Sequence, residues 1–370
     1  MRIALVRKNY TPYGGAENYL RLMARKLADQ GHEIDIYSST EQTDDNFRIS
    51  KIKTSRKPSF LSNIMFAARS KEALQKVSSD FIISFERTFY QDVYRAGDGC
   101  HKEWLNKRSI IEPFLKRVSF KVNPHHLILL YLESRCFQSS RFIVANSMMV
   151  KNDIVRNYKI SPDKISVIYN GVDTDLFKPA GDEKKKALRD SYNIREDNII
   201  LFLGADFKRK GVASLLKAFS LMDLKSTRLI IAGKQAGTEY IPMSTKLGID
   251  NKVIFWGPEK DVKNLYAMSD VFVLPTIYDP FSNATLEAMS SGLPVVTTQH
   301  NGVSEIIDDG VQGFIVDSLD VKLLAEKITS ALANSVSMGK RSRAKAEEYP
   351  INKSINRILE LISVNHNRSI

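Results

Sequence analysis

Runs of consecutive apolar residues alternate with amphipathic stretches along almost the whole chain. Most of these runs are rich in Val, Ile, Leu and Phe and are continuous, which is typical of parallel strands covered by helices on both faces. The predicted strands cover residues 3–6, 33–37, 81–85, 142–145, 165–168, 199–203, 228–232, 253–256, 271–274, 294–297 and 314–316. Because helical stretches lie between them, the pattern predicts an α/β protein with doubly wound sheets.

The alternation of strands and helices restarts once. Residues 168–173 leave a strand and enter a turn-rich stretch, after which Asp182 opens a charged helix. This break predicts two Rossmann-like domains, an N-terminal one over residues 1–169 and a C-terminal one over residues 170–351. Residues 352–370 contain a terminal helix with apolar residues at helical spacing, which could pack on either domain.

Composition adds a preference for anionic partners. Lys and Arg number 54 and Asp and Glu 42, so the 370-residue chain has a net charge of +12. Such a surplus favours nucleic acid, phosphorylated small molecules or an acidic membrane surface. Two cysteines, Cys100 and Cys136, are too few for a disulfide framework and favour a reducing compartment. Since no transmembrane or signal segment is evident, we expect a cytoplasmic protein whose membrane contact is peripheral.

A glycine pair separates the first strand from the first helix. Gly14 and Gly15 let backbone N–H groups approach a ligand, and the N-terminus of the helix that carries Glu17 adds a partial positive charge. The pair therefore indicates a phosphate site, although a tight turn is the alternative interpretation. The G-x-G-x-x-G fingerprint of dinucleotide-binding folds does not occur here.

Three cations, Lys208, Arg209 and Lys210, follow the predicted strand 199–203. Ligands of open α/β sheets bind at the carboxyl ends of the strands. Arg offers a forked pair of donors to phosphate oxygens and Lys a mobile point charge, so together they could neutralise a leaving diphosphate. A solvated run of charges is the alternative.

A pair of acids brackets the start of another predicted helix. Asp279 lies in the loop, Ser282 or Asn283 is a suitable N-cap, and the N–H groups around Ala284 could hold phosphate. One carboxylate can accept hydrogen bonds from both hydroxyls of a ribose, and the other can reach a sugar beyond the phosphates. For Glu287 alone, compensation of the helix dipole is the simpler explanation.

Polar residues flanked by glycines follow the predicted strand 81–85. Residues 92–101 are interpreted as a loop that lines a cleft, with Asp98 and His101 as candidates for acid–base or orienting roles. A capped, hydrogen-bonded loop is the alternative.

Residues 101–121 interleave basic and apolar side chains, which suits an interfacial segment on anionic lipid. Each basic residue near such a surface adds about 1 kcal/mol of attraction. The alternative is an amphipathic helix packed on its own domain. The predicted membrane contacts are Lys102, Trp104, Lys107, Arg108, Lys116 and Arg117.

Together these residues resemble the family 4 retaining glycosyltransferases of GT-B fold, in which two Rossmann-like domains face a central cleft. The resemblance covers nearly the whole chain, in order. Within the family the chain is most similar to the lipopolysaccharide core glucosyltransferases, because of residues 92–100 and of Asp206-Phe207 ahead of Arg209. The family motifs matched are Gly14-Gly15, Asn170-Gly171-Val172-Asp173, Arg209-Lys210-Gly211 and the paired acids Asp279 and Glu287.

The resemblance implies that a nucleotide-sugar, with UDP-glucose favoured, binds mainly to the second domain, in the cleft. Transfer to a lipopolysaccharide core acceptor would retain the anomeric configuration and need no metal or other cofactor, at the inner face of the cytoplasmic membrane. The last helix, within 352–370, would cross back onto the first domain. Arg209 and Lys210 match the cations on the diphosphate, Glu287 the acid on the ribose, and Asp279 the acid on the sugar.

Three sets of site residues follow from the motifs and the resemblance. The predicted donor-binding residues are Gly14, Gly15, Glu17, Arg209, Lys210, Trp256, Asp279, Ser282, Asn283, Ala284 and Glu287. The predicted catalytic residues are Asp98, Arg209, Lys210 and Asp279, and the predicted acceptor-binding residues are Asp98 and His101.

The chain departs from the family at the paired acids, because Asp279 stands where Glu is usual and has a shorter reach toward the sugar. Two alternatives stay open. One is a transferase that uses GDP-mannose or another UDP-sugar on a different lipid-linked or capsular glycan. The other is a nucleic-acid-binding protein, suggested by the charge but lacking any known binding module; no nucleic-acid partner is expected.

Overall fold

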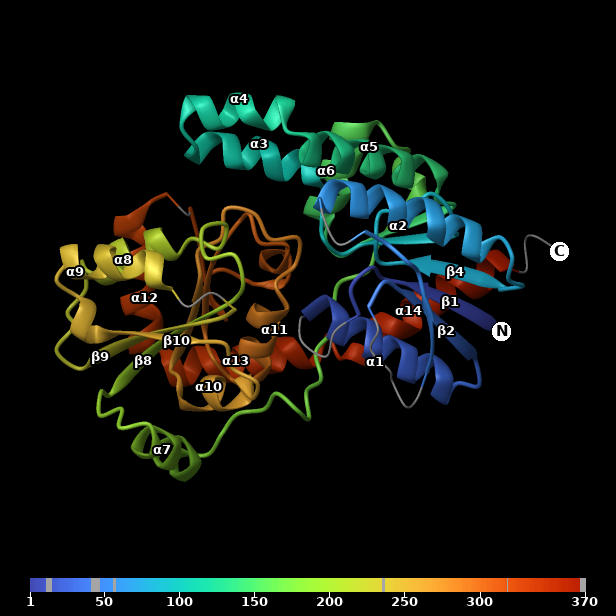
Figure 1. Ribbon diagram of the computed structural model, residues 1–370. Helices are drawn as coiled ribbons and strands as arrows, with labels where there is room; N and C mark the ends of the chain where they lie inside the picture. Colours follow the sequence, from blue (N-terminus) through green and yellow to red (C-terminus); the bar gives the residue numbers. More distant parts are fainter. Residues whose placement is uncertain (11–14, 41–46, 56–57, 235–236, 318, 367–370) are drawn as a thin grey trace. The chain divides into compact units, whose positions relative to one another are not determined.

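The computed structural model describes all residues except 11–14, 41–46, 56–57, 235–236, 318 and 367–370. The chain divides into two compact units, one formed by Met1–Tyr169 with Asn352–Ile370 and the other by Asn170–Ile351. In each unit helices cover a sheet whose strands are all parallel (Figure 1). The expected fold class, two doubly wound α/β domains, is confirmed. Among the described residues, no helix is long and apolar enough to cross a bilayer.

The first unit is built on a sheet with the strand order β3-β2-β1-β4-β5-β6-β7. Parallel pairing sets the register, with Ala4 opposite both Asp35 and Ile82. The strands are β1 (Arg2–Val6), β2 (Glu33–Ser38), β3 (Arg48–Lys51), β4 (Phe81–Ser84), β5 (Val93–Ala96), β6 (Phe142–Ala145) and β7 (Ile165–Val167). The central strands are buried, which explains their continuous apolar sequences.

Seven α-helices are described in the first unit. The last of them docks on the first, where the hydroxyl of Tyr19 lies 2.8 Å from Oγ of Ser354 and both atoms are buried. The helices are α1 (Gly15–Asp29), α2 (Ser59–Leu74), α3 (His101–Ile111), α4 (Phe114–Val122), α5 (Pro124–Ser139), α6 (Met148–Tyr158) and α14 (Ile351–His366).

The second unit repeats the plan with the strand order β10-β9-β8-β11-β12-β13. Its strands are β8 (Asn198–Leu203), β9 (Thr227–Ala232), β10 (Val253–Gly257), β11 (Val271–Leu274), β12 (Val295–Thr298) and β13 (Gly313–Val316). Its helices are α7 (Asp182–Ser191), α8 (Val212–Phe219), α9 (Ile241–Lys246), α10 (Val262–Met268), α11 (Asn283–Ser290), α12 (Val321–Ala333) and α13 (Ser335–Glu347). Arg343 joins α13 to the preceding segments by donating to the carbonyls of Thr174, Phe177 and Ser290.

The structure corrects two sequence-based expectations. Residues Val93–Ala96 form strand β5 in the middle of the sheet, not part of a loop, so only residues 97–100 connect it to α3. The segment 101–121 forms two helices instead of one. They are broken at Pro113, which precedes α4 in an extended conformation and has no backbone N–H to continue α3.

Candidate active site

Two cations and an acid meet at the carboxyl end of β8. Nζ of Lys210 lies 3.2 Å from Oδ2 of Asp279, and Nη1 of Arg209 lies 3.7 Å from the same oxygen. The guanidinium of Arg209 also donates to the carbonyl of Tyr278 at 2.7 Å. Lys210 and Asp279 are both buried. The structure thus brings together three residues that the sequence placed in two separate motifs.

Two glycines, Gly204 and Gly211, allow the conformation of the loop that follows β8 and carries Arg209 and Lys210. A Cβ on Gly204 would collide with the stem of Lys210, and a Cβ on Gly211 would collide with the carbonyl of Pro275. Gly211 also has a φ of +82°, a conformation that side chains rarely adopt. The two glycines let Lys210 lie across the end of β8 while the loop packs on the segment after β11.

Helix α11 begins directly beside these charges. Ser282 is its N-cap, with Oγ accepting from the backbone N–H of Thr285 at 3.2 Å. The backbone N–H of Ser282 donates to Oδ1 of Asn301 at 3.1 Å, which fixes the chain's entry into the helix. Nδ2 of Asn170 donates to Oδ1 of Asn283 at 2.7 Å. A helix start held in this way presents first-turn N–H groups, which favour anions.

Glu287 lies one turn further along α11. Its Oε2 accepts a hydrogen bond of 2.9 Å from the hydroxyl of Tyr266 on α10. Burial raises the pKa of Glu287, and the Tyr266 hydrogen bond and the charge of Lys210 offset only part of that shift. Because α11 begins four residues after Asp279, the structure places both acids in the same part of the second unit. Dipole compensation does not explain Glu287, because it lies beyond the first turn of α11.

Trp256 is held by other neighbours. It lies on edge strand β10, where its indole N–H donates to Oε2 of Glu259 at 3.0 Å. Its ring packs edge-on against Tyr192, with centroids 4.8 Å apart. Neither partner belongs to the cluster around Asp279, so a contact of Trp256 with a nucleobase stays a prediction.

A second polar cluster lies at the carboxyl ends of strands in the first unit. Nη1 of Arg7, just after β1, donates to Oδ2 of Asp98, just after β5, at 3.3 Å. Burial acts to raise the pKa of Asp98, but the charges of Arg7 and Arg87 outweigh it and hold the pKa below its ordinary value. Asp98 is therefore ionised at neutral pH.

His101 is the first residue of α3 and is uncharged. Burial, followed by the charge of Arg87, lowers the pKa of His101 to about 3. Its Nε2 lies 3.2 Å from Nδ1 of His126, and its backbone N–H donates to Glu133 at 2.7 Å. The imidazole can orient a ligand through hydrogen bonds, but it is too weak a base to take a proton at neutral pH.

Sequence reasoning missed several residues that shape these clusters. Arg7 and Arg87 stand after β1 and β4 as Arg209 stands after β8, so a cation following a buried strand was a usable signal. Glu133 lies in an otherwise apolar helical stretch, and a single buried acid there also pointed to a partner. No local pattern marked Tyr266.

Part of the predicted site lies beyond what the structure describes. Gly14 is outside the described residues, as is the side chain of Glu17; Gly15 is the first residue of α1. Within the described part of the chain, no group of three or more His, Cys, Asp or Glu residues is placed to hold a metal ion.

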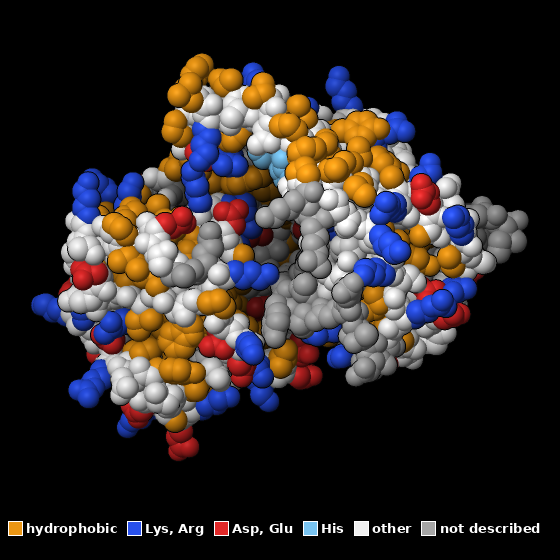
Figure 2. Space-filling view, viewed as in Figure 1, with side chains coloured by type: hydrophobic (Ala, Val, Ile, Leu, Met, Phe, Trp, Pro, Cys, Tyr) orange, Lys and Arg blue, Asp and Glu red, His pale blue; other side chains and the backbone are white. Residues whose placement is uncertain are grey.

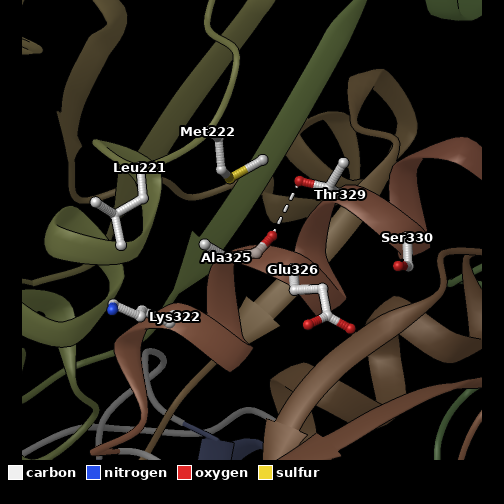
Figure 3. A pocket seen from close by; sticks show the side chains of 7 residues that line it. All are labelled: Leu221, Met222, Lys322, Ala325, Glu326, Thr329 and Ser330. Atoms are coloured by element: carbon white, nitrogen blue, oxygen red, sulfur yellow. Dashed lines mark hydrogen bonds between the residues drawn. The ribbon is translucent and has the colours of Figure 1, made fainter.

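An open pocket of about 350 Å³ lies in the second unit, where the segment after α8 meets α12 (Figure 3). None of the predicted site residues lines it. Its lining residues are Leu221, Met222, Lys322, Ala325, Glu326, Thr329 and Ser330.

Both halves of the chain match known protein families. Residues 13–176 match the family described as Glycosyltransferase Family 4, and residues 184–350 match Glycosyl transferases group 1. An uncharacterized glycosyltransferase of Methanocaldococcus jannaschii is 27% identical over 333 residues, 85% of each chain. The lipopolysaccharide glucosyltransferase WaaG of Escherichia coli is 23% identical over 343 residues, 90% of each chain.

Solved structures share the fold. The crystal structure of WaaG gives a TM-score of 0.85 at 22% identity and covers 97% of this chain and 99% of its own. HepE from Anabaena, solved in complex with UDP-glucose, gives a TM-score of 0.79 at 18% identity. The match covers 98% of this chain and 100% of the HepE chain. With both family matches in order along the chain, the protein belongs to the family 4 glycosyltransferases of GT-B fold.

Proposed function

We propose that this glycosyltransferase moves a hexose, with glucose from UDP-glucose favoured, to a lipopolysaccharide core acceptor with retention of the anomeric configuration. The observation that carries the proposal is the convergence of Arg209 and Lys210 on Asp279 beside the start of α11. Two relatives support the choice of substrates: WaaG is named for lipopolysaccharide glucosyl transfer, and HepE binds UDP-glucose.

The cations serve the leaving group in this proposal. When the bond between the sugar's anomeric carbon and the diphosphate breaks, negative charge grows on the diphosphate oxygens. Arg209, Lys210 and the N-terminus of α11 stabilise that charge from fixed positions, and such electrostatic stabilisation often accounts for most of an enzyme's rate enhancement. The acceptor oxygen forms the new bond on the same face, and its proton passes to a leaving diphosphate oxygen.

Asp279 and Glu287 complete the donor site. Asp279 pairs with both cations in this structure. A bound diphosphate would share those cations and leave the Asp279 carboxylate to accept from a sugar hydroxyl. Glu287, held by Tyr266, would accept from the ribose hydroxyls. On the first unit, ionised Asp98 and neutral His101 are proposed to orient the acceptor.

A panel of nucleotide-sugars tests this assignment through the melting temperature. We expect UDP-glucose to raise it, because a ligand at 100 times its Kd stabilises the folded state by about 2.7 kcal/mol. UDP-galactose, GDP-mannose and ADP-glucose serve as comparisons. A rise with GDP-mannose alone would favour the alternative donor, and no rise with any nucleotide-sugar would contradict the proposed function.

The helices α3 and α4 support a peripheral membrane contact, which is also part of the proposal. Apolar side chains gather along this hairpin (Figure 2), and Phe114 and Leu115 are 73% and 82% exposed. Of the predicted basic contacts, Arg108 and Lys116 pair with buried Glu112, and Arg117 donates to its carbonyl. Apolar side chains that protrude among cations suit the surface of an anionic bilayer.

Liposome co-sedimentation tests the membrane contact. We expect the protein to pellet with vesicles that contain phosphatidylglycerol and much less with phosphatidylcholine alone. The double variant Phe114→Ser/Leu115→Ser should lose most of this binding, since it removes the two most exposed apolar side chains of α4.

Leu221→Ser is the matched control, because Leu221 is also exposed, at 58%, but belongs to the second unit. Equal pelleting with both lipids, or equal losses in the double variant and the control, would count against membrane binding by α4.

A further inference from the structure

We propose that Tyr266 is a positioning residue that aligns the Glu287 carboxylate for ribose and so gives the enzyme its preference for ribonucleotides. This inference rests on the proposed function, in which Glu287 receives the donor's ribose. The observation behind it is that a single buried hydroxyl contacts both Glu287 and the first turn of α11.

The ring of Tyr266 has a fixed place. It lies on α10, is only 1% exposed, and packs edge-on against Phe177 with centroids 5.8 Å apart. Phe272 of β11 contacts it as well, at 6.1 Å between centroids. Because aromatic neighbours and the protein interior hold the ring, its hydroxyl can reach only a small region of space.

The hydroxyl divides its one proton between two acceptors. It lies 2.9 Å from Oε2 of Glu287 and 3.1 Å from the carbonyl oxygen of Ala284. The contact therefore ties the end of a long side chain to the backbone at the start of its own helix. Without it, the Glu287 carboxylate could rotate about its terminal torsion, which has a broad range.

This arrangement leaves acceptor capacity for a ligand. An ionised carboxylate has about four lone-pair positions on two oxygens, of which Tyr266 occupies one. A ribose that offers two O–H donors can use the others. Sites built to pair with hydroxyls discriminate strongly against analogues that lack them, because a buried acceptor is then left without a partner.

Calorimetric titration of Tyr266→Phe with UDP and with 2′,3′-dideoxy-UDP tests the proposal. We expect Y266F to bind UDP about tenfold more weakly, the effect of losing one hydrogen bond to a charged group. Binding of the dideoxy nucleotide should change less than about twofold, because it presents no hydroxyl to Glu287. GDP and ADP, each compared with its 2′,3′-dideoxy form, repeat the test with other nucleobases.

Tyr158→Phe is the matched control. It removes a half-buried tyrosine hydroxyl from another carboxylate, Glu133, in the first unit, and should leave the ribose preference unchanged. Y266F keeps the ring between Phe177 and Phe272, and its melting temperature checks the fold.

The possible results distinguish a failure of the proposed role of Tyr266 from a failure of the proposed function. An equal loss for both nucleotides would show that Tyr266 acts only in folding, and no loss for either would show that Glu287 needs no alignment; both results overturn the proposal. If the unaltered protein binds none of the nucleoside diphosphates, the proposed function itself fails, and the role of Tyr266 falls with it.

Discussion

Replacing Lys210 with Ala is expected to lower kcat by about 100-fold or more, as removing one preorganised donor to a developing charge does in other enzymes. Lys210 is buried, and its ammonium is held 3.2 Å from Asp279 by a loop that crosses the end of β8. In the proposed mechanism, an ammonium fixed in such a place would stabilise a leaving diphosphate without reorganising water. Steady-state kinetics at saturating donor measure the effect.

The control for this variant is Lys217→Ala, which removes an exposed lysine from α8 of the same unit. We expect its kcat to stay within about twofold of the original. The melting temperature of K210A separates lost chemistry from lost folding, since the substitution leaves Asp279 with only Arg209, at 3.7 Å, as its charged partner among the described contacts. An unchanged kcat in K210A would remove Lys210 from the mechanism.

Much of the fold could be predicted because buried parallel strands have a simple signature. Runs such as 199–203 and 271–274 are apolar throughout, and the structure makes them β8 and β11. Strand β3, with the sequence RISK, carries no such signature because it is a half-exposed edge strand. The sequence pattern did not predict strand β5, because the charged Arg95 interrupts its apolar sequence.

Arg95 shows why a local pattern fails at β5. The residue is 5% exposed, yet its guanidinium lies 3.9 Å from the centroid of the Tyr19 ring and also faces Phe85. A cation stacked on aromatic rings can be buried in a central strand. Those rings come from α1 and from the end of β4, so the sequence around Arg95 does not reveal its environment.

The same limit applies to the site. Arg209, Lys210, Asp279 and Glu287 were predictable because motifs after strands place them at one edge of a sheet. Their partners were not, because hydrogen bonds such as that between Tyr266 and Glu287 join different elements and depend on how those elements pack. The motifs predicted which residues gather at this edge of the sheet, whereas packing decides which residues hold them in place.

Replacing Glu133 with Ala is expected to destabilise the first unit by about 3–5 kcal/mol, the usual cost of breaking a buried ion pair. Glu133 is fully buried on α5 and accepts from Nε and Nη2 of Arg87, at 3.1 and 2.9 Å. It also accepts from the Tyr158 hydroxyl at 2.6 Å and from the backbone N–H groups of His101 and Lys102, so it caps the start of α3. The variant leaves a buried guanidinium and a helix terminus without their common acceptor.

Urea denaturation at neutral pH measures this loss of stability. A spectroscopic probe placed in each unit follows the unfolding of that unit separately from the other. Glu72→Ala removes an exposed acid from α2 of the same unit and should change its stability by less than about 0.5 kcal/mol. Glu133 orients His101, the first residue of α3. In E133A, acceptor binding should therefore weaken even at urea concentrations too low to unfold the first unit. Donor binding to the second unit should not change. A first unit as stable in E133A as in the original protein would mean that Arg87 finds another partner, and the capping role assigned to Glu133 would be wrong.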